Sequence, residues 1–152
     1  ELPSLLALAK AGKMEHETTL FKGFKGIQTA IFEALEEMTC DDELLAMGIR
    51  SSKEQQYNIL WQRWHRERIQ KKIACKALFS DKGTPYYYAF KKMKFTHVRV
   101  FHGVTPSAID IMKNKVLIFT YGEEPSCLVI NNSEVAQSFS TFFYNLWRLA
   151  GK

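Results

Sequence analysis

The amino-acid sequence predicts an α/β domain in which helices sandwich a mixed β-sheet. In the first half of the chain, segments with a helical period alternate with short apolar segments, an order typical of α/β proteins. In the second half, four strand-like segments follow one another, which favours antiparallel hairpins. Two of these four are almost continuously apolar, as strands covered on both faces usually are.

Length and composition indicate one globular domain without a membrane span. The chain has 152 residues, of which 46% are hydrophobic and 24% are charged. No apolar run approaches the ~20 residues that a transmembrane helix needs. Because no repeat or low-complexity linker interrupts the sequence, residues 13–152 are predicted to form a single domain.

The first twelve residues are interpreted separately. The segment ELPSLLALAK starts without Met and lacks the charged, apolar and small-residue regions of a signal peptide. We expect a short helix over residues 2–12 that ends near Gly12. Residues 1–12 are therefore interpreted as a linker from a domain upstream in a longer protein.

The domain is predicted to begin with a strand over residues 15–22. The segment GFKGIQTAIFEALEEM follows, and its apolar residues recur at i, i+3, i+4 and i+7, which predicts an amphipathic helix. The buried stripe of this helix is expected to be Ile27, Ala30, Ile31, Ala34, Leu35 and Met38.

A less regular strand is expected within residues 40–49, and a second helix over residues 53–70. Ser51 and Ser52 before Glu54 indicate where this helix starts. The segment KKIACKALF then predicts a strand that ends at the turn SDKG. The face of the second helix that is expected to be buried carries Tyr57, Leu60, Trp61, Trp64 and Arg68.

A short third helix is predicted where Thr84 can act as N-cap and Pro85 as the first helical residue. It covers YYYAFKKM, and its three consecutive tyrosines cannot all face inward on one helix. The strands expected after it are THVRVFH, SAIDIM, KVLIFTY and SCLVIN.

A fourth helix is expected over residues 133–150, with Asn132 or Ser133 as its cap and Glu134 favouring the helix dipole. Aromatic and aliphatic residues recur along it at helical spacing. Its apolar face is predicted to be Val135, Phe139, Phe142, Phe143, Leu146 and Trp147.

The net charge is +5, and the densest basic stretch is WQRWHRERIQKK. A solvated helix face is one interpretation of this stretch. Direct nucleic-acid binding through residues 62–72 is another, although such a surface needs exposed aromatics for stacking. Trp61, Trp64 and Ile69 are expected to face the core instead.

The cysteines and histidines indicate neither a disulfide framework nor a metal site. Cys40, Cys75 and Cys127 form no C-x-x-C pair, and an odd count without a framework favours the reducing cytoplasm. The four histidines have no ligand spacing with any cysteine. We therefore expect no metal and no cofactor.

Gly23 and Gly26 flank Lys25 at a predicted strand-to-helix junction. The glycines can serve a tight turn, or the helix N-terminus together with Lys25 can hold an anion. The segment KGFKGIQ matches neither nucleotide-binding fingerprint. No serine has a G-x-S-x-G context, so nucleophilic catalysis has no motif here.

The C-terminal segment resembles a known family. The order TPSAIDIMKNKVLIFTY, then EEPSCLVINN, then SEVAQSFSTFFYNLW resembles the C-terminal end of TrmB-type transcriptional regulators. The upstream FKGFKGIQTAIFEAL is similar to the entry of that family's domain, and ELPSLLALA to the linker after its winged helix. The resemblance implies a phospholipase D-like fold and covers nearly the whole chain.

Active members of the phospholipase D superfamily carry H-x-K-x-x-x-x-D, and the resemblance allows a test for it. Aligning on Asn114-Lys115-Val116 places the three motif positions at Pro106, Ala108 and Lys113. None of these residues supplies the histidine nucleophile or its partners. His97 and His102 lack a Lys and an Asp at the required interval.

The resemblance therefore implies a non-enzymatic regulatory, effector-sensing or dimerising domain of a cytoplasmic transcription regulator. Such a protein is expected to be a homodimer that contacts DNA through an upstream winged helix. A small-molecule effector is expected near the strand ends, and the alternative is a divergent phosphodiesterase or nuclease. The candidate ligand-binding residues are Gly23, Lys25, Gly26, Thr105 and Asp110.

Overall fold

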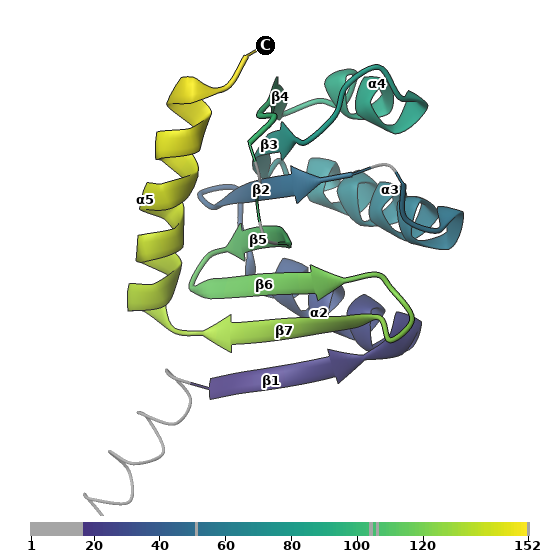
Figure 1. The fold of residues 1–152 in the computed structure, drawn as a ribbon. Helices are drawn as coiled ribbons and strands as arrows, with labels where there is room; N and C mark the ends of the chain where they lie inside the picture. The colour runs from purple at the N-terminus through teal and green to yellow at the C-terminus, as the bar shows by residue number, and fades with distance from the viewer. Residues whose placement is uncertain (1–16, 51, 104, 106, 152) are drawn as a thin grey trace, which may run out of the picture.

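The computed structural model describes residues 17–50, 52–103, 105 and 107–151 (Figure 1). The helix expected over residues 2–12 lies outside the described residues. The helices are α2 (Gly23–Glu37), α3 (Gln55–Gln70), α4 (Pro85–Lys91) and α5 (Ser133–Leu149). The strands are β1 (Glu17–Lys22), β2 (Glu43–Ile49), β3 (Ala74–Phe79), β4 (Thr96–Val100), β5 (Ala108–Met112), β6 (Lys115–Thr120) and β7 (Ser126–Asn131).

The strands form one mixed sheet of seven in the order β1-β7-β6-β5-β2-β3-β4. β2, β3 and β4 pair in parallel, and the other neighbours pair antiparallel. Following these pairings, β6 runs in the same direction as β2. The ends of β2 and β6 therefore lie at the same edge of the sheet as the start of β5.

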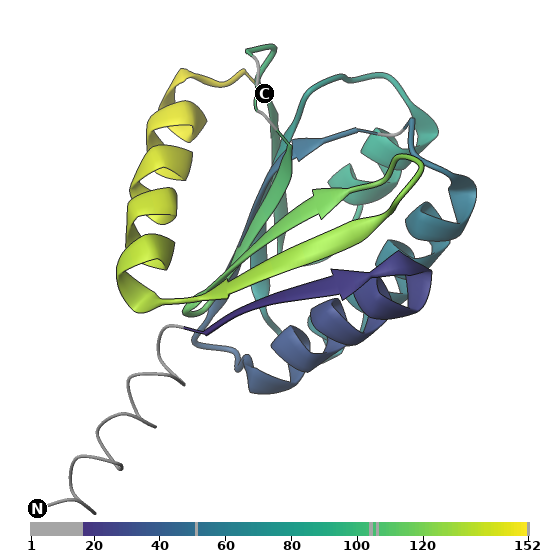
Figure 2. The same cartoon turned by 60° about the horizontal axis from the view of Figure 1, so that its bottom comes forward.

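Helices cover both faces of the sheet, as predicted. Figures 1 and 2 show α5 alone on one face and α2, α3 and α4 on the other. The larger core lies under α2, α3 and α4, where the predicted stripe of α2 is buried. Trp64 on α3 donates a hydrogen bond from Nε1 to the carbonyl of Ile31 on α2, at 2.7 Å.

The predicted helix starts are confirmed at two places. Thr84 caps α4 by accepting a hydrogen bond from the backbone N–H of Tyr87. Asn132 caps α5 by accepting from the N–H groups of Glu134 and Val135. Helix α3 begins later than expected, at Gln55, so Lys53 remains in the preceding connection.

Two predictions about α5 and β3 are wrong in detail. Phe142 was placed on the apolar face of α5, but its side chain is 45% exposed. A helix that packs on a sheet as a single layer buries only a narrow strip, here Ala136, Phe143, Leu146 and Trp147. Strand β3 starts at Ala74, because Lys71 caps α3 and Lys72 adopts a left-handed conformation with φ 60°.

Candidate functional site

A cavity of about 430 Å³ lies between the sheet and helices α3 and α4. It opens over the edge at which β2 and β6 end and β5 begins. Small residues of the sheet form the floor of the cavity, and aromatic rings form its walls.

The floor of the cavity is low because small residues surround Asp110. Asp110 on β5 pairs in register with Ala46 on β2 and with Leu117 on β6. Ala46 and Ala108 both border the cavity on the same face of the sheet as Asp110. Alternation along β5 buries Ile109 and Ile111 on the opposite face, under α5.

Gly48 allows the segment before β5 to approach the end of β2. Its φ is +70°, and a Cβ at this position would lie 2.5 Å from the carbonyl oxygen of Ser107 and 2.5 Å from Oγ1 of Thr105. No real Cβ tolerates such contacts, so a glycine is needed here. The glycine thereby lets Thr105 and Ser107 line the cavity.

The walls are aromatic and come from several elements. Trp61 donates a hydrogen bond from Nε1 to the Tyr121 hydroxyl at 2.9 Å, and its ring meets that of Phe119 edge-on at 5.4 Å. Such edge contacts and satisfied N–H groups hold rings in fixed positions. The aromatic residues that line the cavity are Trp61, Tyr86, Phe90, Phe119 and Tyr121.

Asp110 is a buried carboxyl group with few partners. Its side chain is only 6% exposed, and no hydrogen bond reaches it from the residues that the structure describes. Burial raises the pKa of Asp110 to about 8, although the nearby charge of Lys53 acts in the opposite direction. The group therefore stays protonated near neutral pH unless a cation reaches it.

Lys53 projects its ammonium into the same cavity. Nζ donates to the carbonyl of Arg50 at 2.7 Å and lies 4.3 Å from the centre of the Tyr86 ring. Burial lowers the pKa of Lys53 to about 8, while the charges of Asp110 and Asp81 act to raise it. Lys53 and Asp110 influence each other electrostatically but form no direct ion pair.

His65 borders the cavity as a neutral imidazole whose hydrogen position is determined by a buried arginine. Nε of Arg68 donates to Nδ1 of His65 at 2.9 Å. Because arginine only donates, Nδ1 must be unprotonated and Nε2 carries the hydrogen. Burial lowers the pKa of His65 well below its ordinary value, and the positive charges of Arg68 and Lys53 lower it further.

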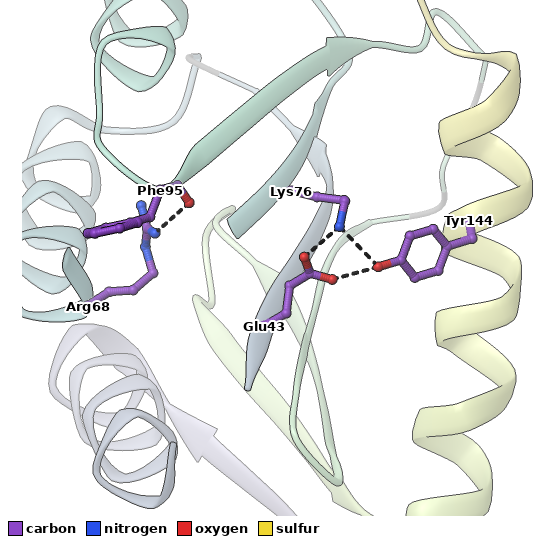
Figure 3. Close-up of polar contacts among 5 residues, drawn as sticks. All are labelled: Glu43, Arg68, Lys76, Phe95 and Tyr144. Carbon is purple, nitrogen blue, oxygen red and sulfur yellow. Dashed lines mark hydrogen bonds and ion pairs between the residues drawn. The ribbon is translucent and has the colours of Figure 1, made fainter. Parts of the chain in front are cut away.

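Arg68 itself is fully buried on neutral acceptors. Its guanidinium donates to the carbonyls of Ile73 and Phe95, at 2.7 and 3.3 Å, and to Oγ1 of Thr96 at 2.6 Å. Figure 3 shows the contact between Arg68 and Phe95. The guanidinium ties the end of α3 to the starts of β3 and β4, which holds His65 in place.

The burial of Arg68 removes one charge from the predicted basic stretch. Arg63, Arg66, Lys71 and Lys72 remain exposed. The aromatics of the same helix, Trp61 and Trp64, are buried as expected. The stretch thus presents basic side chains without the exposed rings that nucleic-acid stacking needs.

The structure brings together only part of the sequence-predicted site. Thr105 and Asp110 both line the cavity, whereas Gly23, Lys25 and Gly26 do not. These three lie at the same sheet edge, at the start of α2, where the N–H of Gly23 donates to the carbonyl of Pro125 at 2.7 Å. A Cβ on Gly26 would approach the backbone of Phe21 at 2.9 Å, so this glycine has a packing reason.

Lys53 and His65 are among the cavity residues that sequence reasoning missed. Lys53 was taken as part of a helix start, and His65 lies within the basic stretch, where charge obscures its orientation. One signal was present, because His65 is four residues after Trp61 and three before Arg68, on the face that was expected to be buried.

Of the three positions aligned with the phospholipase D motif, the structure describes Ala108, the first residue of β5, and Lys113, which directly follows β5. Ala108 lines the cavity, and Lys113 lies in the β5–β6 hairpin at the opposite edge, where Nζ donates to the carbonyl of Glu37 at 3.2 Å. Pro106 lies outside the described residues. His97 and His102 do not line the cavity.

A second polar cluster lies on the other face, beside α5 (Figure 3). Glu43 accepts a hydrogen bond from the Tyr144 hydroxyl at 2.5 Å and pairs with Nζ of Lys76 at 2.5 Å. Lys76 also donates to the Tyr144 hydroxyl at 3.3 Å. Each group has its partners within the protein, so the cluster attaches α5 to β2 and β3.

Two further observations concern the described part of the chain. Within residues 17–50, 52–103, 105 and 107–151, no three His, Cys, Asp or Glu side chains converge as metal ligands. In the same residues, no helix combines the length and the apolarity of a membrane span.

Comparison with known proteins identifies similar folds. No protein-family model matches the sequence, and no curated protein matches it either. NucT from Helicobacter pylori superposes with a TM-score of 0.65 at 11% identity, over 90% of this chain and 99% of that one. Nuc from Salmonella typhimurium, a phospholipase D family member, gives 0.62 at 11% identity, over 90% and 97%.

A third similar structure is TrmBL2, described as an archaeal chromatin protein with a novel mode of DNA binding. It superposes with a TM-score of 0.63 at 17% identity, over 99% of this chain and 60% of that chain. Identities this low establish likeness of fold alone. On this basis the chain has a phospholipase D-like α/β fold, with its cavity at the strand ends.

Proposed function

We propose that this chain is the regulatory domain of a TrmB-type transcription regulator and that its cavity binds a small-molecule effector without catalysis. The observation that carries the proposal is the cavity of about 430 Å³ beside Ala108, the position aligned with the motif lysine. An alanine there has no group to bind or activate a phosphate. The cavity is present but the motif lysine is replaced by alanine, which favours ligand binding over catalysis.

The state of His65 supports the same proposal. Among the described residues that line the cavity, His65 is the one histidine. A histidine nucleophile attacks with a free nitrogen lone pair. The lone pair of Nδ1 is engaged by Arg68, and Nε2 carries the hydrogen, so His65 can donate a hydrogen bond but lacks a free lone pair.

In the proposed mechanism the protein is a cytoplasmic homodimer that binds DNA through an upstream winged helix. An effector in the cavity contacts β2, β5, α3 and α4 together, so it favours the arrangement in which these elements are closest. That preference would change the dimer geometry and with it the spacing of two DNA-reading helices. The likeness to TrmBL2, a DNA-binding protein, supports this placement.

The regulator is tested with the full-length protein that contains this chain. Its affinity for DNA selected from random sequence is measured by fluorescence anisotropy, with and without a compound that raises the melting temperature of the chain. We expect the compound to change DNA affinity at least about fivefold, the lower end of typical allosteric coupling. The proposal would be contradicted if the full-length protein bound no DNA. It would also be contradicted if no stabilising compound changed the DNA affinity.

The competing function is a divergent phosphodiesterase or nuclease, favoured by the likeness to NucT and Nuc. It predicts hydrolysis of bis(p-nitrophenyl) phosphate that disappears in a histidine variant. We expect no hydrolysis above the level of the buffer. Turnover lost in His65→Ala, or in the paired His97→Ala and His102→Ala variant, would establish the enzyme instead.

A further inference from the structure

The cavity contains an acid and a base that face the same space without touching. Asp110 rises from the floor on β5, and Lys53 reaches in from the connection between β2 and α3. Each shifts the titration of the other, yet no direct ion pair joins them. Both groups therefore line one cavity without a direct ion pair between them.

Neither group has enough partners within the protein. The Asp110 carboxyl receives no hydrogen bond from the described residues, and of the three N–H groups of Lys53 one is used, on the Arg50 carbonyl. Buried polar groups normally find partners because leaving them unpaired is costly. The missing partners of Asp110 are donors, and those of Lys53 are acceptors.

One wall of the cavity is aromatic, while Arg50, Ser52, Thr105, Ser107 and Thr120 add polar groups at its margin. The rings of Trp61 and Phe119 meet edge-on at 5.4 Å, and Phe119 stacks on Tyr121 at 5.9 Å. Phe90 closes the α4 side. These rings form a wall for a hydrocarbon or aromatic group, and a volume of about 430 Å³ accommodates a small metabolite.

We propose that the cavity binds an α-amino acid with an apolar side chain in its zwitterionic form. The ligand ammonium donates to Asp110, the ligand carboxylate accepts from Lys53, and the side chain packs among Trp61, Phe90 and Phe119. The proposal rests on the proposed function, of which it specifies the effector class.

A ligand with one charge satisfies only half of this arrangement. An amine would pair with Asp110 but would bring a second positive charge beside Lys53. A carboxylate would pair with Lys53 but would bring no positive charge to Asp110, which would stay protonated. A zwitterion places an opposite charge at each group and adds no net charge to the cavity.

Binding should also release protons. The pKa of Asp110, about 8 in the free protein, falls when the ligand ammonium approaches, because a neighbouring positive charge favours the carboxylate. Asp110 therefore loses its proton on binding near pH 7. A ligand without a positively charged group would not cause this proton release.

The experiment is isothermal titration calorimetry of the chain at pH 7 in two buffers with different ionisation enthalpies. The probes are L-phenylalanine and L-leucine, with phenethylamine and 3-phenylpropanoate as analogues that each lack one charge. We expect the amino acids to bind with proton release and each analogue to bind at least about tenfold more weakly. Asp110→Asn and Lys53→Met should each weaken amino-acid binding at least about 30-fold.

Matched controls lie on exposed surface away from the cavity. Glu36→Gln on α2 corresponds to the acid variant, and Lys92→Met after α4 corresponds to the lysine variant. Both should bind as the unmodified chain does. Circular dichroism verifies that Asp110→Asn and Lys53→Met are folded, so that lost binding reports the cavity.

The outcomes separate the ligand class from the proposed function. An analogue that binds as tightly as the amino acid, or binding that ignores both cavity variants, overturns the zwitterion. If no amino acid stabilises the chain but another metabolite does through the cavity, the ligand class is wrong and the regulatory function stands. Histidine-dependent hydrolysis of bis(p-nitrophenyl) phosphate overturns the function itself.

Discussion

Each face of the sheet has a lysine near a carboxyl group, but of these two lysines only the one on the α5 face forms an ion pair with it. On the α5 face, Lys76 contacts Glu43 at 2.5 Å, and their side chains are 26% and 30% exposed. On the other face, Asp110 is buried and Lys53 is half-buried, and the two line one cavity without forming an ion pair. Burial acts to lower the pKa of both lysines. For Lys76 the hydrogen bonds with Glu43 and Tyr144 outweigh burial and raise the pKa, whereas for Lys53 burial prevails and the pKa is lowered.

The contrast distinguishes a structural contact from the proposed binding site. The Glu43–Lys76–Tyr144 cluster satisfies its own polar groups and attaches one helix to the sheet. Asp110 instead carries a desolvation cost that no hydrogen bond from the described residues offsets, and Lys53 offsets its own cost only in part, through the Arg50 carbonyl and the Tyr86 ring. Stability is lowered at such a place in exchange for a group that a ligand can use.

The largest expected effect is on the pH dependence of stability, through Asp110. Asp110 has a folded pKa of about 8, above its ordinary 3.8, so between these values the unfolded chain has lost a proton that the folded chain keeps. Stability should therefore fall as pH rises from 4 to 8, by up to roughly 5 kcal/mol from this group. Urea unfolding across this range should show a shallower fall for Asp110→Asn than for the unmodified chain.

Glu36→Gln is the control for that experiment and should keep the slope of the unmodified chain. Equal slopes in the unmodified chain and Asp110→Asn would mean that Asp110 is ionised in the folded protein.

The next effect tests the close approach that shapes the cavity. Gly48→Ala should cost about 2–4 kcal/mol, since it combines a left-handed φ of +70° with contacts to Thr105 and Ser107. Gly83→Ala is a matched variant, because Gly83 has φ +88° with nothing within 4 Å of a Cβ. It should cost only about 1 kcal/mol, from the backbone alone. Similar losses in thermal unfolding of the two variants would show that the approach at Gly48 is not tight.

A smaller effect is expected on the α5 face. Glu43→Gln should destabilise the fold by about 1 kcal/mol or less, because the pair is partly exposed and screened by solvent. The loss should shrink further in 1 M NaCl, as measured by thermal unfolding. If Glu43→Gln weakened ligand binding in the cavity, the two faces would not be independent.

The smallest effect is expected on the basic surface of α3. Replacing Arg63 and Arg66 together by Gln should leave the affinity of the chain for single-stranded DNA unchanged, because the Tyr and Trp rings of this helix are all buried and cannot stack on bases. Anisotropy at low salt provides the measurement. A steep loss of affinity in this variant, with a strong salt dependence in the unmodified chain, would restore direct nucleic-acid binding as a function.

The helices and strands could be predicted from the sequence because their signals are local. The helical spacing of Ile27, Ile31 and Ala34 defines the buried face of α2 within a few turns. Thr84 before Pro85, and Asn132 before α5, mark helix starts through side chains that bond to their own neighbours. The alternation of β5 likewise places Asp110 opposite Ile109 and Ile111.

The cavity was decided by tertiary structure, because its residues come from segments distant in the sequence. The pairing of β2 with β5 brings Ala46 beside Asp110, and the irregularity of β2 at Gly48 admits Thr105. Lys53 lines the cavity because α3 starts at Gln55, two residues later than predicted, which leaves Lys53 in the connection between β2 and α3. Lys25 shares the same sheet edge but is kept apart by the intervening strands β7 and β6. The spacing of residues in the sequence reveals the period of a helix or strand. Whether Asp110 and Lys53 line one cavity depends instead on which strands pair.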